Sequence, residues 1–137
     1  MFEPENNQLT ESTRAKLKNL SKSLLRLHKI LLDAERAQYE LVNGRVQTTG
    51  EMLRLVLDDA HFAWLRILSG QIVFIDELLA SKQSTDETDG KSLIEQTRRL
   101  LNFEDNNENF KNKFQSALQN NSNAVINYNE ALGFVKE

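Results

Sequence analysis

The sequence predicts an all-α protein, folded as an up-and-down four-helix bundle with a short extra helix between the first helix and the long central one. Three observations carry this prediction. The single proline is Pro4, so the body of the chain is free of a residue that costs roughly 3 kcal/mol inside a helix. Apolar residues recur at steps of three and four, which is the spacing of one helix face. Alternating runs of β-branched and aromatic residues between hairpin dipeptides, which indicate strands, are missing.

The first helix is predicted to begin after Thr10, whose hydroxyl suits an N-cap, with Glu11 favourable in the first turn. It is predicted to end at Asn43 and Gly44, because glycine accepts the left-handed conformation that stops a helix. An apolar stripe along this helix should face the core, as in a bundle. The stripe consists of Leu17, Leu20, Leu24, Leu27, Leu31, Ala34 and Leu41.

A short second helix is predicted to begin after Thr48, which forms a capping-box pair with Glu51. Asp59 is placed to cap the next helix, which covers about residues 60–81 and is the most apolar of the chain. Two neighbouring apolar stripes on this helix imply contact with more than one neighbour, so we expect it to lie centrally. The stripes are Leu65, Leu68, Ile72, Ile75 and Leu79, and beside them Trp64, Ile67, Phe74 and Leu78.

Two further helices complete the predicted bundle. Residues 82–90 are polar and typical of a mobile loop, and the fourth helix is predicted over residues 91–101. The last helix carries apolar residues over 110–132. Four polar residues at 120–123 weaken this helix and predict a kink there.

Composition and charge narrow the class of protein. Residues 1–9 are expected to form a flexible arm, and residues 10–137 one domain. The chain has no cysteine, which excludes disulfides and thiolate nucleophiles. The formal net charge is −3, and the basic start of the first helix gives way to acidic residues, so we expect no nucleic-acid partner. The N-terminus is unlike a secretory signal, and the longest charge-free apolar run, residues 67–75, is too short for a bilayer. We therefore expect a cytoplasmic protein with no membrane partner.

One group of residues offers ligands for a metal ion. Asp58 and His61 are three residues apart, a spacing that brings side chains to one helix face, and Glu35 lies two turns after His28 on another helix. If His28, Glu35, Asp58 and His61 converge, they form a site for a divalent metal or a small ligand. The alternative is that His28 packs between leucines and His61 lies at a helix start. The second Glu-x-x-His unit of di-iron bundles is missing.

A second group is suited to contact with a partner or ligand. Gly70 lies inside the central helix, where glycine costs up to about 1 kcal/mol relative to alanine, and this indicates close approach by another backbone or a ligand. The alternative is a tight crossing within the bundle. Trp64 and Arg66 are residue types enriched at binding hot spots, although a core position is the alternative for Trp64. We add Tyr39 of the first helix as a further aromatic candidate.

Motifs of known catalytic chemistry are missing from the sequence, including the P-loop and the Gly-x-Ser-x-Gly elbow. Paired acids such as Asp58 and Asp59 are adjacent, and adjacent side chains on a helix point about 100° apart, so they do not share a site. We therefore expect a non-enzymatic helical bundle without a cofactor, which acts by contact with a protein partner or with a second copy as a homodimer. The alternative function is binding of a metal or a small ligand.

The stretch from Leu27 to Glu77, with a Gly-x-Val turn at Gly44 and Val46, resembles a pattern seen in small bacterial all-helical proteins of unknown function. The resemblance implies a bacterial helical domain and no particular activity. The residues that carry it are His28, Asp33, Glu35, Tyr39, Asp59, Phe62, Trp64, Leu65, Arg66, Ser69 and Asp76.

Overall fold

The computed structural model describes residues 7–81, 86–105 and 107–136, and in these ranges the chain is all-α. The same ranges contain no strand, only one isolated antiparallel bridge between Gln8 and Asp86. The predicted fold class is confirmed at this level. The elements are α1 (Glu11–Asn43), α2 (Thr49–Asp58), the 3₁₀ turn η1 (Ala60–Phe62), α3 (Ala63–Ala80), α4 (Glu87–Leu101), α5 (Glu108–Gln119) and α6 (Ser122–Val135).

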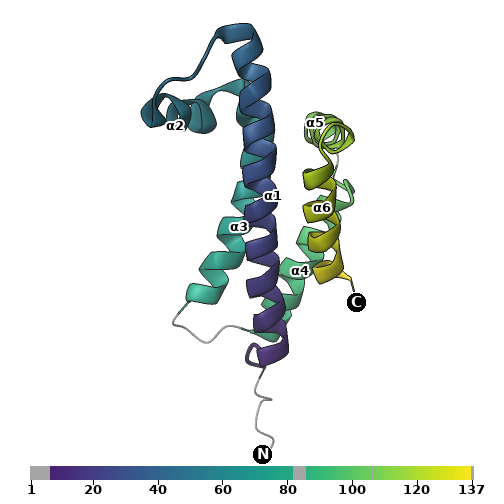
Figure 1. Ribbon diagram of the computed structural model, residues 1–137. Coiled ribbons are helices and arrows are strands. Elements are labelled where there is room, and N and C mark those ends of the chain that lie inside the picture. The colour runs from purple at the N-terminus through teal and green to yellow at the C-terminus, as the bar shows by residue number, and fades with distance from the viewer. Residues whose placement is uncertain (1–6, 82–85, 106, 137) are drawn as a thin grey trace, which may run out of the picture.

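The helices pack as a bundle around α1, the longest element (Figure 1). α1 contacts α3, α4, α5 and α6, and α4 in turn contacts α3 and α6. Among the described residues, α3 and α6 do not contact each other, because they lie on different flanks of α1. The core therefore lies where α1 and α4 face each other between these two flanking helices.

Five leucines of α1 form the centre of the core, and all five are fully buried, as the stripe predicted; they are Leu17, Leu20, Leu24, Leu27 and Leu31. They belong to one cluster with Leu65, Leu68 and Ile75 of α3. The prediction is wrong for Leu41, which is 80% exposed. The end of α1 runs beyond the other long helices (Figure 1), so no neighbour covers its last turns.

Local capping explains where the helices begin and end. The Thr10 hydroxyl accepts a backbone N–H of the first turn of α1 at 3.1 Å, and the Thr48 hydroxyl does the same for α2 at 3.0 Å. The Asp59 carboxylate caps η1, which leads into α3, at 2.8 Å. Gly44 ends α1 in the left-handed region, with φ of 86°. These four sequence predictions are confirmed.

The fourth helix begins earlier than predicted. α4 starts at Glu87, so residues 86–90 are its N-cap and first turn rather than part of a loop. The side chain of Asp86 accepts a backbone N–H of this turn at 2.7 Å, which is the capping role of an aspartate. Residues 1–6 and 82–85, predicted as a flexible arm and a mobile loop, lie outside the described residues.

The first turn of α4 is hydrogen-bonded to the start of α1. The Glu87 carboxylate accepts the backbone N–H of Thr10 at 2.8 Å and the Thr13 hydroxyl at 2.6 Å. These hydrogen bonds, the one from the Thr10 backbone first, hold the pKa of Glu87 below its usual range. The Asn7 carbonyl accepts the Glu87 N–H at 2.7 Å, so residues 7–9, expected in the flexible arm, lie against α4.

Gly90 lies inside α4, at the buried place where this helix meets α1. A Cβ atom at Gly90 would overlap Leu9 Cδ1 and would lie 3.0 Å from Thr13 Cγ2. Gly90 was predicted to be the last residue of the mobile loop over residues 82–90. Its role in the fold is instead the close approach of two helices, which the missing side chain permits.

The predicted last helix is two helices. α5 ends at Gln119 and α6 begins at Ser122, and the side chain of Asn121 between them accepts the backbone N–H of Ala124 at 3.1 Å. The sequence predicted a kink here, and the observed change is a complete break with a new N-cap. The break lets α5 cross the end of the bundle while α6 runs back along α1 (Figure 1).

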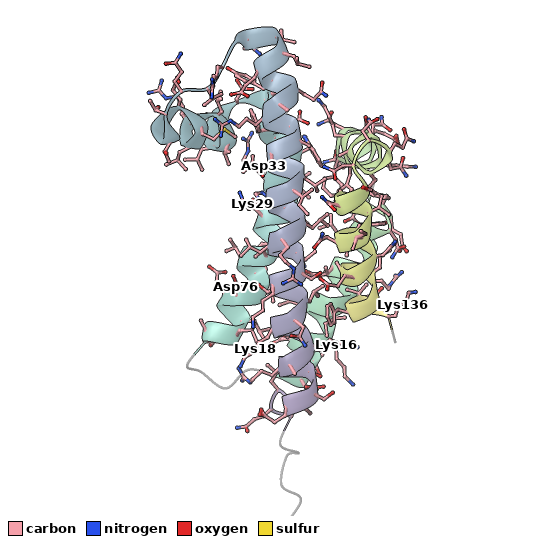
Figure 2. The ribbon with its side chains drawn as sticks, in the orientation of Figure 1. Lys16, Lys18, Lys29, Asp33, Asp76 and Lys136 are labelled. Atoms are coloured by element: carbon pink, nitrogen blue, oxygen red, sulfur yellow. The ribbon has the colours of Figure 1, made fainter. Side chains whose placement is uncertain are left out.

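Polar bonds fix α1 against its two flanking helices. Ser21 Oγ donates to Asp76 of α3 at 2.6 Å, and Lys16 Nζ donates to the backbone carbonyl of Lys136, just after α6, at 3.3 Å. Figure 2 shows Asp76 on one flank of α1 and Lys136 on the other. These bonds set the rotation of α1, and therefore which of its side chains reach each neighbour.

α2 is the least buried helix and stands apart from the bundle (Figure 1). None of its residues is buried, and it contacts only α3 and η1 among the described elements. Arg66 of α3 donates to the carbonyl oxygen of Val56 at 2.7 Å, near the C-terminal end of α2. This bond satisfies one of the free carbonyls that every helix end leaves and ties α2 to α3.

Candidate functional site

Two adjoining hollows form a groove between α3 and α4, which we call the α3–α4 groove. The hollows have volumes of about 410 Å³ and 390 Å³, and Phe74 and Gln96 line both of them. Gln71, which lines the first hollow, donates to the Thr97 hydroxyl at 2.9 Å, and both residues are buried. Gln71 and Thr97, the buried polar residues beside the groove, are thus paired with each other. The exposed side chains that line the groove remain available for a partner.

An exposed ring and an empty space lie side by side in this groove. Phe74 is 57% exposed and its neighbour Val73 is 50% exposed, so the second apolar stripe of α3 is left partly uncovered. Gly70 lies one turn before Phe74, and a Cβ atom there would meet nothing within 4 Å. The predicted close approach at Gly70 is therefore not made within the described chain. The surface instead has a projection at Phe74 and a gap at Gly70.

The two ends of the groove carry opposite charges. Arg66 and Arg99 line the hollow at one end, where Asp105 lies 3.7 Å from Arg99 and offsets part of the positive charge. Asp89 lines the hollow at the other end. Glu77 is exposed on the turn of α3 that follows Phe74. The groove is therefore positive at the start of α3 and negative towards its end.

The structure separates the four residues predicted to contact a partner. Arg66 and Gly70 line the α3–α4 groove. Trp64 is only 1% exposed and packs against Phe114 of α5 with ring centroids 6.0 Å apart. A side chain this buried is part of the core, so it cannot be the centre of a surface contact in this fold. Tyr39 packs against the His61 ring, with centroids 5.7 Å apart, away from the groove.

The four residues predicted as metal ligands come together only in part. His61 Nε2 lies 2.7 Å from Glu35 Oε2 without an aligned hydrogen bond, and the contact is an ion pair only when the imidazole is protonated. Asp58, at the exposed end of α2, and His28 do not join this pair. Within the described ranges, no group of three or more His, Asp or Glu side chains is placed to hold a metal ion. The second neighbour of the Glu35 carboxylate is the ammonium group of Lys113, at 3.5 Å.

His28 is a half-buried residue of α1, and its Nε2 atom is buried without a hydrogen-bond partner. Burial lowers the pKa of His28 from its ordinary value of 6.5, because the charged imidazolium loses its hydration. The unfolded chain therefore binds a proton more readily than the folded chain does. The stabilising effect of neutral His28 is complete above the unfolded pKa and is lost as the pH falls through that value towards the folded one.

We expect the free energy of unfolding of the wild type to fall when the pH is lowered from about 7.5 to about 5.5, and His28→Gln to remove part of that fall. Urea unfolding followed by circular dichroism at the two pH values measures both. The matched control is His61→Gln, which removes the other of the two histidines in the sequence. An unchanged pH difference in His28→Gln would show that burial of this imidazole has no effect on stability.

Sequence reasoning missed Lys113, Gln96 and the exposure of Phe74. Lys113 is far from Glu35 in the sequence and reaches it only because α5 crosses α1, which no local pattern indicates. Phe74 fitted an apolar stripe, and a stripe shows which face is apolar but not whether a neighbour covers it. Of the residues that line the groove, Arg66 and Gly70 were predicted from the sequence as contact residues.

The comparisons with known proteins give no further information about this chain. No protein-family model, curated protein or solved structure matches it. Among the described residues, no helix is both long enough and apolar enough to cross a membrane.

Proposed function

We propose that this protein acts by protein–protein contact, and that the contact is a homodimer formed through the α3–α4 groove. The observation that supports this proposal is the pairing of the exposed Phe74 ring with the empty space at Gly70, one helical turn away. A two-fold dimer uses the same surface patch on both subunits, so the patch must be complementary to itself. A projection next to a gap meets this requirement.

The register of the proposed dimer follows from the same two residues. When two copies of α3 pack antiparallel about a point midway between Gly70 and Phe74, each phenyl ring enters the gap above Gly70 of the second copy. This places an apolar anchor in a pocket at the centre of the interface, which is where binding hot spots concentrate. The contact covers the Phe74 ring, and so hides part of the apolar surface of α3 that the bundle leaves exposed.

The charges at the ends of the groove favour this orientation. A two-fold axis at its middle reverses the groove, so the end with Arg66 and Arg99 in one copy meets the end with Asp89 and Glu77 in the other. Opposite charges at the rim of an interface select the partner and fix its register, even where they add little to the affinity. A parallel arrangement of the two α3 helices would bring like charges together.

For the fold, we infer an up-and-down four-helix bundle of α1, α3, α4 and α6, with α2 and α5 as helical connections. The four helices alternate in direction along the axis of α1 (Figure 1), and each packs against its two neighbours in the order α1, α3, α4, α6. Short or helical connections between antiparallel neighbours are typical of this topology. This arrangement leaves one side of both α3 and α4 free of further helices, which is where the α3–α4 groove lies.

The dimer is tested by the mass of the protein in solution. We expect size-exclusion chromatography with light scattering to give twice the monomer mass for the wild type. Phe74→Glu should shift the protein to monomer by raising the dissociation constant roughly 30-fold or more, because it removes a central apolar anchor. The matched control is Ile126→Glu on α6, since Ile126 is similarly apolar and 64% exposed. The control should remain a dimer.

The orientation has a separate test, which uses the absence of cysteine from the chain. Val73→Cys introduces a single thiol one residue from the midpoint between Gly70 and Phe74, which is the level of α3 where the proposed two-fold axis passes. Mild oxidation should therefore link this variant into covalent dimers, whereas Ile126→Cys should stay unlinked. A wild type that is monomeric at all concentrations up to the millimolar range would contradict the proposal, as would equal linking of the two variants.

A further inference from the structure

A further cavity lies where α1, η1 and α5 meet, and it shares no lining residue with the α3–α4 groove of the proposed dimer. Its volume is about 480 Å³, within the range of pockets for small molecules. Its wall holds three charged or ionisable side chains from three different elements: Glu35 of α1, His61 of η1 and Lys113 of α5.

Glu35 is the anchor of the cavity. It is buried, and its oxygen Oε2 is the atom that both His61 Nε2, at 2.7 Å, and Lys113 Nζ, at 3.5 Å, approach. The Glu35 side chain is 10% exposed and lines the cavity, so a ligand in the cavity can reach the carboxylate. A carboxylate is an acceptor only and has room for several donors on its two oxygens, so it can receive a donor from a ligand.

Three residues contact His61: Tyr39, Phe62 and Asp59. Its ring lies 5.7 Å from Tyr39 and 5.5 Å from Phe62, measured between centroids, and its backbone N–H is bound by Asp59 at 2.8 Å. The imidazole therefore keeps its position beside Glu35 without depending on that carboxylate. Glu35 and His61 together form a rigid wall, and the residue that can move is Lys113, whose side chain is 39% exposed.

The rest of the cavity is small and polar. Ala34, Ala37 and Ala117 contribute short side chains, which leave the space open, and Gln38 and Asn120 contribute amide groups. Amides both donate and accept hydrogen bonds, so they suit a ligand with mixed polar groups. A metal ion suits this wall poorly, because the Lys113 ammonium lies 3.5 Å from the oxygen that a metal would bind.

We propose that this cavity binds a small zwitterion, a free α-amino acid, with its ammonium group on the Glu35 carboxylate and its own carboxylate on Lys113 Nζ. The two charged groups of an α-amino acid are separated by one carbon atom, and this short spacing matches a carboxylate and an ammonium group that lie 3.5 Å apart in the wall. Each end of the ligand then makes a charge-assisted hydrogen bond. A ligand with one charge meets one attractive and one repulsive group, so the wall discriminates against it.

The experiment uses isothermal titration calorimetry of the full chain with a panel of free L-amino acids. For the tightest binder, the two matched probes are the analogue without the amino group and the analogue without the carboxylate; for L-alanine these are propionate and ethylammonium. We expect the zwitterion to bind and both analogues to bind at least about tenfold more weakly, the effect of one lost charge-assisted bond.

Two variants assign the binding to this cavity. Lys113→Gln should lower the affinity for the zwitterion by about tenfold or more. Lys111→Gln, on the same helix but outside the cavity wall, should leave this affinity unchanged. Lys113 is a partly exposed residue, so its variant is expected to fold, which circular dichroism checks. The proposal is overturned if no amino acid in the panel binds, if a singly charged analogue binds as tightly, or if Lys113→Gln binds like the wild type. The oligomeric state of Phe74→Glu is a separate matter, so either proposal can fail alone.

Discussion

Replacing Trp64 with alanine is expected to lower the free energy of unfolding by about 3–5 kcal/mol, the cost of removing a large buried aromatic side chain. Trp64 is 1% exposed and sits against two rings of α5, Phe110 and Phe114, at centroid distances of 6.4 Å and 6.0 Å. Alanine leaves a cavity that the rigid helices around it fill only in part. Urea unfolding followed by circular dichroism measures the loss.

The controls separate packing from other effects of the substitution. Trp64→Phe keeps an aromatic ring and removes the indole N–H, which is buried without a hydrogen-bond partner, so it should cost much less than Trp64→Ala. Phe74→Ala is an equally drastic truncation of an aromatic residue on the same helix. Because Phe74 is 57% exposed, its loss should leave the stability of the monomer within about 0.5 kcal/mol. A stable Trp64→Ala variant would mean that the tryptophan is not part of the core.

Replacing Gly90 with valine is expected to lower the free energy of unfolding by about 3 kcal/mol. This is the upper end of the usual cost of overpacking, and it arises because the new side chain overfills the contact between α4 and α1. The new side chain would meet Leu9 and Thr13, and Thr13 is a stiff β-branched residue in the first turn of α1. The change also strains the neighbouring bonds from α1 to Glu87. Thermal and urea unfolding both report the effect.

Gly133→Val is the matched control for this prediction. Gly133 lies inside α6, and a Cβ atom there would meet nothing within 4 Å. The backbone change is the same in both variants, whereas only Gly90 has a neighbour that a side chain would strike. We expect Gly133→Val to alter the stability by less than about 0.5 kcal/mol. Equal effects at the two positions would show that helix propensity, and not the close approach, is responsible.

Much of the fold could be predicted from the sequence because it depends on local chemistry. A hydroxyl or carboxylate at Thr10, Thr48 and Asp59 satisfies N–H groups within the next few residues, and Gly44 stops α1 through its own backbone. The buried leucines of α1 follow from helical spacing alone. The same spacing wrongly predicted that Leu41 is buried. Burial there requires a neighbouring helix, and the end of α1 extends beyond the other long helices.

The candidate sites were harder to predict because they depend on contacts distant in the sequence. Trp64 and Phe74 belong to the same apolar stripe, yet α5 covers the first and no described element covers the second. Likewise, Glu35 and His61 were candidates from their residue types, but Lys113 joins them only after the break at Asn121 lets α5 cross α1. A periodic pattern specifies a face, whereas the order of helices in space decides what meets that face.

The loose attachment of α2 means that this molecule has two levels of stability. The amide hydrogens of α2 can exchange with solvent through a local opening that leaves the leucine core intact, whereas those in the middle of α1 exchange only when the whole bundle unfolds. Arg66 connects the two levels, since it holds the carbonyl end of α2 and also lines the α3–α4 groove. A second copy that draws Arg66 towards its own Glu77 would release α2, so self-association and the opening of this helix would be thermodynamically coupled.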